Sequence, residues 1–164
     1  MPSADDPATF SAPIDEQLPI FIDEHREVLS HILDDLTEAE ARAELVPSKT
    51  TLLGLMKHAT FVEKVWFAEA VTGRSRDELG IVAGPDESFD LSSEDTVESV
   101  QRDYRTAIEE SRAAVAGLGL DDLLPGNRRG PLPLRWIYLH VLRELAQHCG
   151  HADILREQIL ARRS

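Results

Sequence analysis

Cysteine is almost absent from this sequence of 164 residues, since Cys149 is the only one. No disulfide can therefore form within the chain. The sequence also lacks any run of about 18 consecutive apolar residues, the length that a membrane-spanning helix needs. The first residues, MPSADDPATFSAP, have neither a positively charged start nor an apolar stretch, so they do not resemble a secretory signal. Together these absences predict a soluble protein of the cytoplasm.

Positive charge is scarce as well. Only 17 Lys and Arg residues stand against 30 Asp and Glu residues, which gives a formal net charge of −13. Such a chain repels phosphate backbones and anionic lipid surfaces, so we expect neither a nucleic acid nor a membrane as partner. The composition leaves room for a cationic or neutral small molecule as substrate.

The hydrophobic share of 42% suffices for a folded core in one domain of this length. Residues 1–14 are rich in Pro, Ser, Ala and Asp and show no periodic pattern, so we interpret them as a flexible N-terminal tail. Residues 15–164 are then expected to form a single domain.

Four long segments of this domain carry apolar residues at helical spacing, with charged residues in between. They run from about Glu16 to Leu36, from Pro47-Ser48 to Gly73, from Ser92 to about Gly117, and from Leu134 to about Leu160. Long connections rich in glycine and proline separate the second segment from the third and the third from the fourth. Because no segment alternates convincingly like a strand, the sequence predicts an all-α protein built as a four-helix bundle.

Short polar side chains mark the expected helix starts. Ser48 or Thr50 is a plausible N-cap of the second helix, and Ser92 or Ser93 of the third. Gly73 is expected to end the second helix in a left-handed conformation, because glycine adopts it without steric cost.

The fourth segment carries the residues that suggest chemistry. At 100° per residue, His140, Glu144, His148 and His151 fall within roughly an 80° arc of one helix face. The same face carries apolar residues that should point at the other helices. Burying three imidazoles and a carboxylate without partners would be costly, and a bound metal ion would compensate for that cost.

The rise along the helix separates the possible ligand pairs. Glu144 and His148 are four residues apart, about 6 Å in rise, so both can reach one ion. His140 and His148 are separated by about 12 Å, which is too far. His151 is an alternative or additional ligand to His148, although His140 and His151 suit a role in orienting the ligands better.

A third ligand must come from another helix. His58 lies near the middle of the apolar face of the second segment. Two imidazoles and a carboxylate suit a divalent ion and leave coordination positions open for water or substrate. Cys149 lies 100° around the helix from His148, so we interpret it as a buried structural thiol rather than a nucleophile.

These stretches resemble the DinB superfamily, a family of metal-binding helical bundles that includes YfiT-like proteins. The resemblance is closest to the actinobacterial branch that is similar to mycothiol transferases. It rests on residues 45–67, on Tyr104 and on residues 134–157, and it extends over about 16–160. The string HCGHADILRE is its most specific part.

The resemblance implies a bundle with a long crossover between the second and third helices, and one divalent ion, often zinc or nickel. The residues that match the family's ligands are His58, Glu144 and His148. The sequence departs from its relatives at Gln147, where they usually have Arg, and at its end, REQILARRS, where they usually have Ile-Asp-Gly.

The resemblance also implies an activity. It predicts a metal-dependent S-transferase that uses a low-molecular-weight thiol such as mycothiol against a small-molecule electrophile. His151 or His140 would accept the thiol proton, and Arg135, Trp136 and Tyr104 would line the cofactor pocket. The alternatives are a metal-dependent hydrolase, a mycothiol-dependent isomerase and a non-enzymatic metal-binding bundle. Apolar surface positions permit a homodimer.

Overall fold

The computed structural model describes residues 2–163, so residue 1 of the predicted tail and residue 164 of the predicted domain lie outside the described part. Most of this part is helical, which confirms the predicted all-α class. The elements in chain order are α1 (Pro7–Phe10), α2 (Ile14–Ser30), α3 (Glu38–Ala41), α4 (Leu52–Glu63), η1 (Lys64–Glu69), α5 (Ala70–Thr72), η2 (Glu87–Phe89), α6 (Val97–Val115), β1 (Leu123–Leu124), β2 (Leu132–Pro133) and α7 (Leu134–Ala161).

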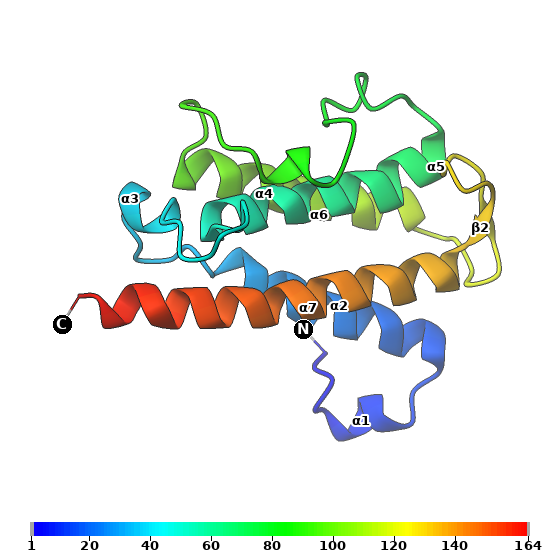
Figure 1. Cartoon of the computed structure of the whole chain (residues 1–164). Helices are drawn as coiled ribbons and strands as arrows, with labels where there is room; N and C mark the ends of the chain where they lie inside the picture. The colour runs from blue at the N-terminus through cyan, green and yellow to red at the C-terminus, as the bar shows by residue number, and fades with distance from the viewer. Residues whose placement is uncertain (1, 164) are drawn as a thin grey trace.

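Four long helical segments lie side by side, namely α2, the continuous run α4–η1–α5, α6 and α7 (Figure 1). The largest interfaces join α2 to α7 and α4 to α6, and α7 also packs against α4. The helix α7 therefore lies between α2 and α4. Since α4 and α7 share an interface, donor groups on these two helices can meet.

The segments α2 and α7 run in the same direction. The thiol of Cys149 contacts the carbonyl of His25, and further along the chain Arg156 of α7 donates to the carbonyl of Ile32, just after the end of α2. The segments α4 and α6 also run in the same direction, and residues 73–96 connect them by returning along the molecule (Figure 1).

Helix ends follow local side-chain chemistry. Thr51 caps α4 by accepting from the amide of Gly54, and Thr96 and Ser99 form a reciprocal capping box at the start of α6. Both caps lie one to four residues beyond the predicted ones. Gly73 ends α5 with φ 67°, which confirms the predicted left-handed C-terminal residue.

The run α4–η1–α5 contains a π-helical stretch, η1, which the sequence did not predict. A π-helical turn inserts residues relative to an α-helix and rotates the following side chains. Trp66 lies within this stretch and contacts His140 of α7. The irregular turn thus places an aromatic ring beside the candidate site.

Two regions differ from the expected irregular chain. Residues 2–13, interpreted as a tail, include the one-turn helix α1 and fold back on α2, where Glu24 accepts from the hydroxyl of Ser3 and the amide of Ala4. The connection before α7 contains a short antiparallel hairpin, in which β1 and β2 have two residues each.

Within residues 2–163, no helix is both long and apolar enough to cross a membrane.

Candidate metal centre

Three donor side chains from two helices converge on one point. The Nε2 atoms of His58 on α4 and His148 on α7 lie 4.0 and 3.6 Å from the same oxygen, Oε2 of Glu144. One ligand atom from each residue lies within 4.8 Å of the other two. Bonds of about 2.0 to 2.2 Å around a tetrahedral ion separate its ligand atoms by about 3.3 to 3.6 Å, so small side-chain rotations suffice. These three residues form a group that can hold a metal ion.

The pair on α7 has the spacing that one helical turn requires, since Glu144 and His148 are four residues apart. His58 comes from the opposing face of α4, where it is 5% exposed. Among residues 2–163 this is the one cluster of three or more such donors with this geometry. Two imidazoles and one carboxylate suit a borderline divalent ion and leave room for a further ligand.

His58 is held by its neighbours in a single tautomer. Its ring stacks on Phe89 with 4.3 Å between centroids, and its Nδ1 lies 2.7 Å from the hydroxyl of Ser88. That hydroxyl donates its only hydrogen to the carbonyl of Pro85. Because it must therefore accept from His58, Nδ1 carries the proton and Nε2 directs its lone pair at Glu144.

The electrostatics keep these donors in their ligating forms. Burial lowers the pKa of His58, which favours the neutral imidazole. The neighbouring imidazoles of His148 and His58 hold the pKa of Glu144 well below its usual range, so this carboxylate is ionised. Neutral imidazole and ionised carboxylate are the forms that bind a cation.

The imidazole of His148 is less completely hydrogen-bonded than that of His58. Its Nδ1 is buried and has no hydrogen-bond partner within the part of the chain that the structure describes. Buried polar atoms without a partner are uncommon in folded proteins. A cation bound at Nε2 would leave the ring proton on Nδ1, so ion binding does not supply the missing partner.

A cavity of about 310 Å³ opens beside the donors. It is lined by His58, Phe61, Val62, Val65, Trp66, Arg76, Pro85, Asn127, Arg128, Arg129, His140 and Glu144. Its size suits a small organic ligand. The cavity brings a possible substrate next to two of the three donor residues.

His140 lines this cavity, and Trp136, which is not among the lining residues, packs against its ring. The ring of His140 stacks on Trp136 at 5.1 Å between centroids, and the tilted ring of Trp66 contacts it at 4.1 Å. Its Nδ1 accepts from Arg143 at 2.8 Å, which leaves the ring proton on Nε2, 3.8 Å from Oε1 of Glu144. Burial lowers the pKa of His140, and the neutral ring can orient Glu144 as a donor.

Three other residues from the sequence prediction lie outside the cavity lining. His151 is exposed, and its ring lies 5.5 Å from that of His148. Arg135 is ion-paired with Asp121 at the surface. Tyr104 is fully buried on α6, where burial raises its pKa.

Cys149 is buried and faces α2 rather than the donors. Its Sγ lies 3.6 Å from the carbonyl oxygen of His25. Burial raises the pKa of the thiol to about 11, so it stays protonated near neutral pH. These properties support the interpretation of a structural thiol.

Several residues at the site were not predicted from the sequence. Ser88 and Phe89 orient His58 although they belong to the connection between α5 and α6, and Trp66 depends on the π-helical turn. Arg128 and Arg129 come from the loop between β1 and β2. A single clue was visible, the Gly-Asn-Arg-Arg-Gly string, which stands out in an acidic chain.

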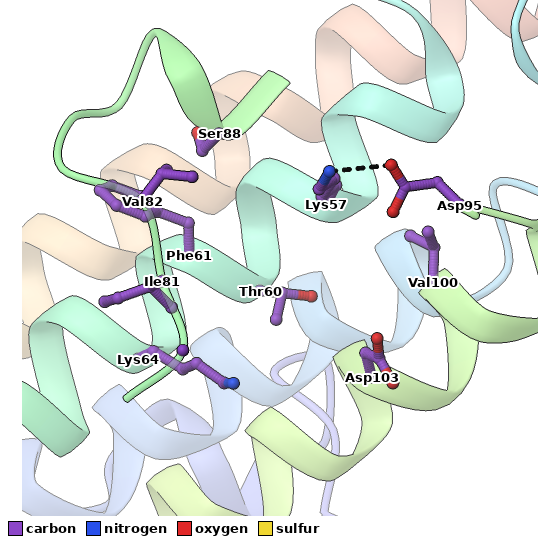
Figure 2. Close-up of a pocket in the computed structure, with 11 residues that line it drawn as sticks. Lys57, Thr60, Phe61, Lys64, Ile81, Val82, Ser88, Asp95, Val100 and Asp103 are labelled. Atoms are coloured by element: carbon purple, nitrogen blue, oxygen red, sulfur yellow. Dashed lines mark hydrogen bonds and ion pairs between the residues drawn. The ribbon is translucent and has the colours of Figure 1, made fainter. Parts of the chain in front are cut away.

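A second cavity, of about 150 Å³, lies beneath the crossover, where Ile81 and Val82 stand over α4 (Figure 2). Of its two lysines, Lys57 and Lys64, Lys57 is already paired with Asp95 at 2.9 Å and donates to the carbonyl of Asp90. The described residues place no cluster of metal donors there. The cavity beside His58 is therefore the better candidate for the functional site.

The fold and the site together define an all-α protein with a candidate mononuclear centre of two histidines and one glutamate. A model of the mycothiol S-transferase family matches residues 17–161. The chain belongs to this family of the DinB superfamily, which confirms the resemblance noted from its sequence.

A solved structure shares the fold. It is described as a conserved protein of locus from Enterococcus faecalis and aligns with a TM-score of 0.65 at 13% identity, over 92% of this chain and 99% of that chain. No curated protein matches the sequence.

Proposed function

We propose that the protein is a thiol S-transferase that depends on a divalent metal ion, zinc or nickel, and uses a low-molecular-weight thiol such as mycothiol. The observation that carries the proposal is the convergence of His58, Glu144 and His148 within 4.8 Å beside an open cavity. Membership of the mycothiol S-transferase family supports the choice of thiol. The proposal includes a cytoplasmic location, where reducing conditions keep such a thiol available.

The proposal extends to the fold. We assign residues 15–164 to one domain, a four-helix bundle of DinB type in which residues 73–96 are the long crossover. The homodimer stays a prediction, which sedimentation equilibrium tests directly.

Each donor has a defined part. His58, Glu144 and His148 would hold the ion, and a bound divalent ion lowers the pKa of a thiol held against it. The cavity would hold the electrophile next to that sulfur. The sulfur then forms a bond to the electrophilic carbon, while the bond from this carbon to its leaving group breaks and the leaving group departs with the electron pair.

The thiol proton needs an acceptor, and we propose His151. It lies beside His148 and is exposed, so it can pass the proton on to water. His140, the other candidate from the sequence, already uses Nδ1 to accept from Arg143. We therefore propose that His140 positions Glu144.

Among the residues expected to contact the thiol, Trp136 has the strongest support. It stacks on His140 and lies beneath the guanidinium of Arg129, whose carbon is 5.7 Å from the ring centroid. Arg135 would have to leave Asp121 to reach a ligand, and Tyr104 would act only through the packing of α6.

The test compares His148→Ala with His31→Ala, a control that removes an exposed histidine of the α2 terminus. Elemental analysis should find about one ion per chain in the wild type and control, and far less in His148→Ala. Adding the ion to metal-free protein should raise Tm in the wild type and control only, since a ligand bound only by the native state stabilises it by RT ln(1 + [L]/Kd).

Activity completes the test. Transfer of mycothiol to a chlorinated aromatic electrophile should fall at least about 100-fold in His148→Ala, while its helical circular dichroism is retained. Unchanged turnover in this variant would refute metal dependence. Consumption of the electrophile without thiol would indicate a hydrolase, and metal binding without any turnover would indicate a non-enzymatic bundle.

A further inference from the structure

Three arginines surround the mouth of the cavity, although the chain as a whole is strongly acidic. Arg76 comes from the crossover, and Arg128 and Arg129 come from the loop between β1 and β2. Glu144 is the only carboxylate among the cavity-lining residues, and it faces the imidazoles at the donor end. The local charge therefore differs in sign from the net charge of −13.

The arginine loop is fixed to the end of α5. The amide of Gly126 donates to the carbonyl of Ala70 at 2.8 Å. A Cβ at Gly126 would lie 2.1 Å from the carbonyl oxygen of Glu69, so only glycine permits this approach. The side chain of Asn127 accepts from the amide of Arg129 at 2.9 Å. These contacts present the two arginines in a defined place.

The existing partners do not neutralise these guanidinium groups. Arg76 and Arg128 share one carboxylate, Glu69, at 3.1 and 3.6 Å. Arg129 has no carboxylate or hydrogen-bond partner for its side chain within residues 2–163; its guanidinium carbon lies 5.6 Å from the ring centroid of Trp66 and 5.7 Å from that of Trp136. The mouth thus keeps positive charge and unused N–H donors.

The two ends of the cavity differ in chemistry. Phe61 and Trp66 line it with aromatic surface, His58 and Glu144 form the donor end, and the arginines form the mouth. Guanidinium groups bind carboxylates and related oxyanions in paired, charge-assisted hydrogen bonds. A ligand that fits both ends has an apolar or aromatic body with an anionic group.

We propose that Arg128 and Arg129 bind the anionic group, a carboxylate or similar oxyanion, of the electrophile, with its reactive carbon directed at the metal centre. This specificity differs from the cationic or neutral substrate for which the composition leaves room. The assignment to the electrophile rests on the proposed function, whereas the anion site itself rests on the loop geometry alone.

The first experiment measures binding without turnover. Full-length protein, freed of metal with a chelator, is titrated with 3,5-dinitrobenzoate and with the neutral 3,5-dinitrobenzamide. Tryptophan emission reports the site, because the chain has two tryptophans, Trp66 and Trp136, and both contact Arg129. The benzoate should bind about tenfold more tightly than the amide, as expected for one charge-assisted contact.

Matched variants identify the residues. Arg129→Gln and Arg128→Gln should each reduce this preference severalfold, and Arg129→Lys should retain part of it because the charge remains. Arg102→Gln, which changes an exposed arginine of α6, should behave as the wild type. Equal affinity for the two probes, or an unchanged preference in Arg129→Gln, would overturn the proposal.

A second experiment separates this inference from the proposed function. With metal-loaded protein, Arg129→Gln should raise KM about tenfold for 4-chloro-3,5-dinitrobenzoate and change KM for the thiol and for neutral 1-chloro-2,4-dinitrobenzene much less. A higher KM for the thiol instead would overturn the assignment to the electrophile. Anion binding without turnover would refute the transferase and retain the anion site. Turnover with equal KM for the anionic and the neutral electrophile would refute the anion site and retain the transferase.

Discussion

At the scale of single residues, the state of His58 depends on a hydroxyl from a different segment. Ser88 belongs to η2 in the crossover, and it is 1% exposed. Its hydrogen bond to Nδ1 directs the lone pair of Nε2 toward Glu144. A bond of this kind on the far nitrogen of a ligating histidine fixes the ring and increases its basicity.

We expect Ser88→Ala to lower the affinity for the divalent ion about 10- to 100-fold, because the buried Nδ1–H loses its acceptor and the ring loses its fixed orientation. Competition against a chromogenic chelator measures this affinity. Ser93→Ala, an exposed position nearby, should leave it unchanged. Wild-type affinity in Ser88→Ala would show that the ring is held by Phe89 alone.

At the scale of elements, the site depends on how short irregular segments pack against long helices. The π-helical turn η1 brings Trp66 to His140, and the loop after β1 contacts the end of α5 through Gly126. Such contacts leave no space for added atoms. A glycine in such a close contact and a glycine with open space around it should therefore respond in opposite ways to replacement by alanine: the first change lowers stability and the second raises it.

Gly126→Ala should destabilise the protein by about 1 to 3 kcal/mol, because its Cβ would lie 2.1 Å from the carbonyl oxygen of Glu69 and would displace the loop. Gly150→Ala on α7 is the matched control, since nothing lies within 4 Å of its Cβ and alanine favours a helix by about 1 kcal/mol. Denaturant unfolding should show a lower midpoint and free energy of unfolding in the first variant and slightly higher values in the second. A stable Gly126→Ala would contradict the close approach.

At the scale of the whole molecule, a buried ion pair joins two of the long helices, α2 and α4. Arg26 donates to both carboxylate oxygens of Glu63 at 2.8 and 2.7 Å, and Glu63 is fully buried. Burial alone would lower the pKa of Arg26, but the charge and hydrogen bonds of Glu63 raise it above its usual value. The pair stays charged and specifies how these two helices are aligned.

Removing one charge of this pair should destabilise the protein. Glu63→Gln leaves Arg26 charged and buried with Asp23 as its remaining carboxylate partner, and we expect it to lower the free energy of unfolding by about 3 kcal/mol. The double variant Arg26→Met with Glu63→Met should recover much of this loss, since no buried charge remains. Urea denaturation of the single and double variants measures both effects. Equal losses in the two variants would show that shape, rather than charge, matters at this position.

The sequence was sufficient for the class of fold and for the core of the candidate site. Periodic apolar residues predict the four long helices because burial of one face is a local property of each segment. Glu144 and His148 could be paired for the same reason, since a spacing of four residues places them one turn apart. The match to the mycothiol S-transferase family confirms the relationship that these motifs suggested.

Only the tertiary structure decided which distant groups meet. The hydrogen bond that His58 donates to Ser88 depends on the crossover, and the contact of Trp66 with His140 depends on a π-helical turn; neither segment has a periodic signature. The positive cavity mouth depends on a loop fixed to the end of α5. Composition averages charge over the chain, so it pointed away from an anionic ligand, whereas folding concentrates Arg128 and Arg129 at one place.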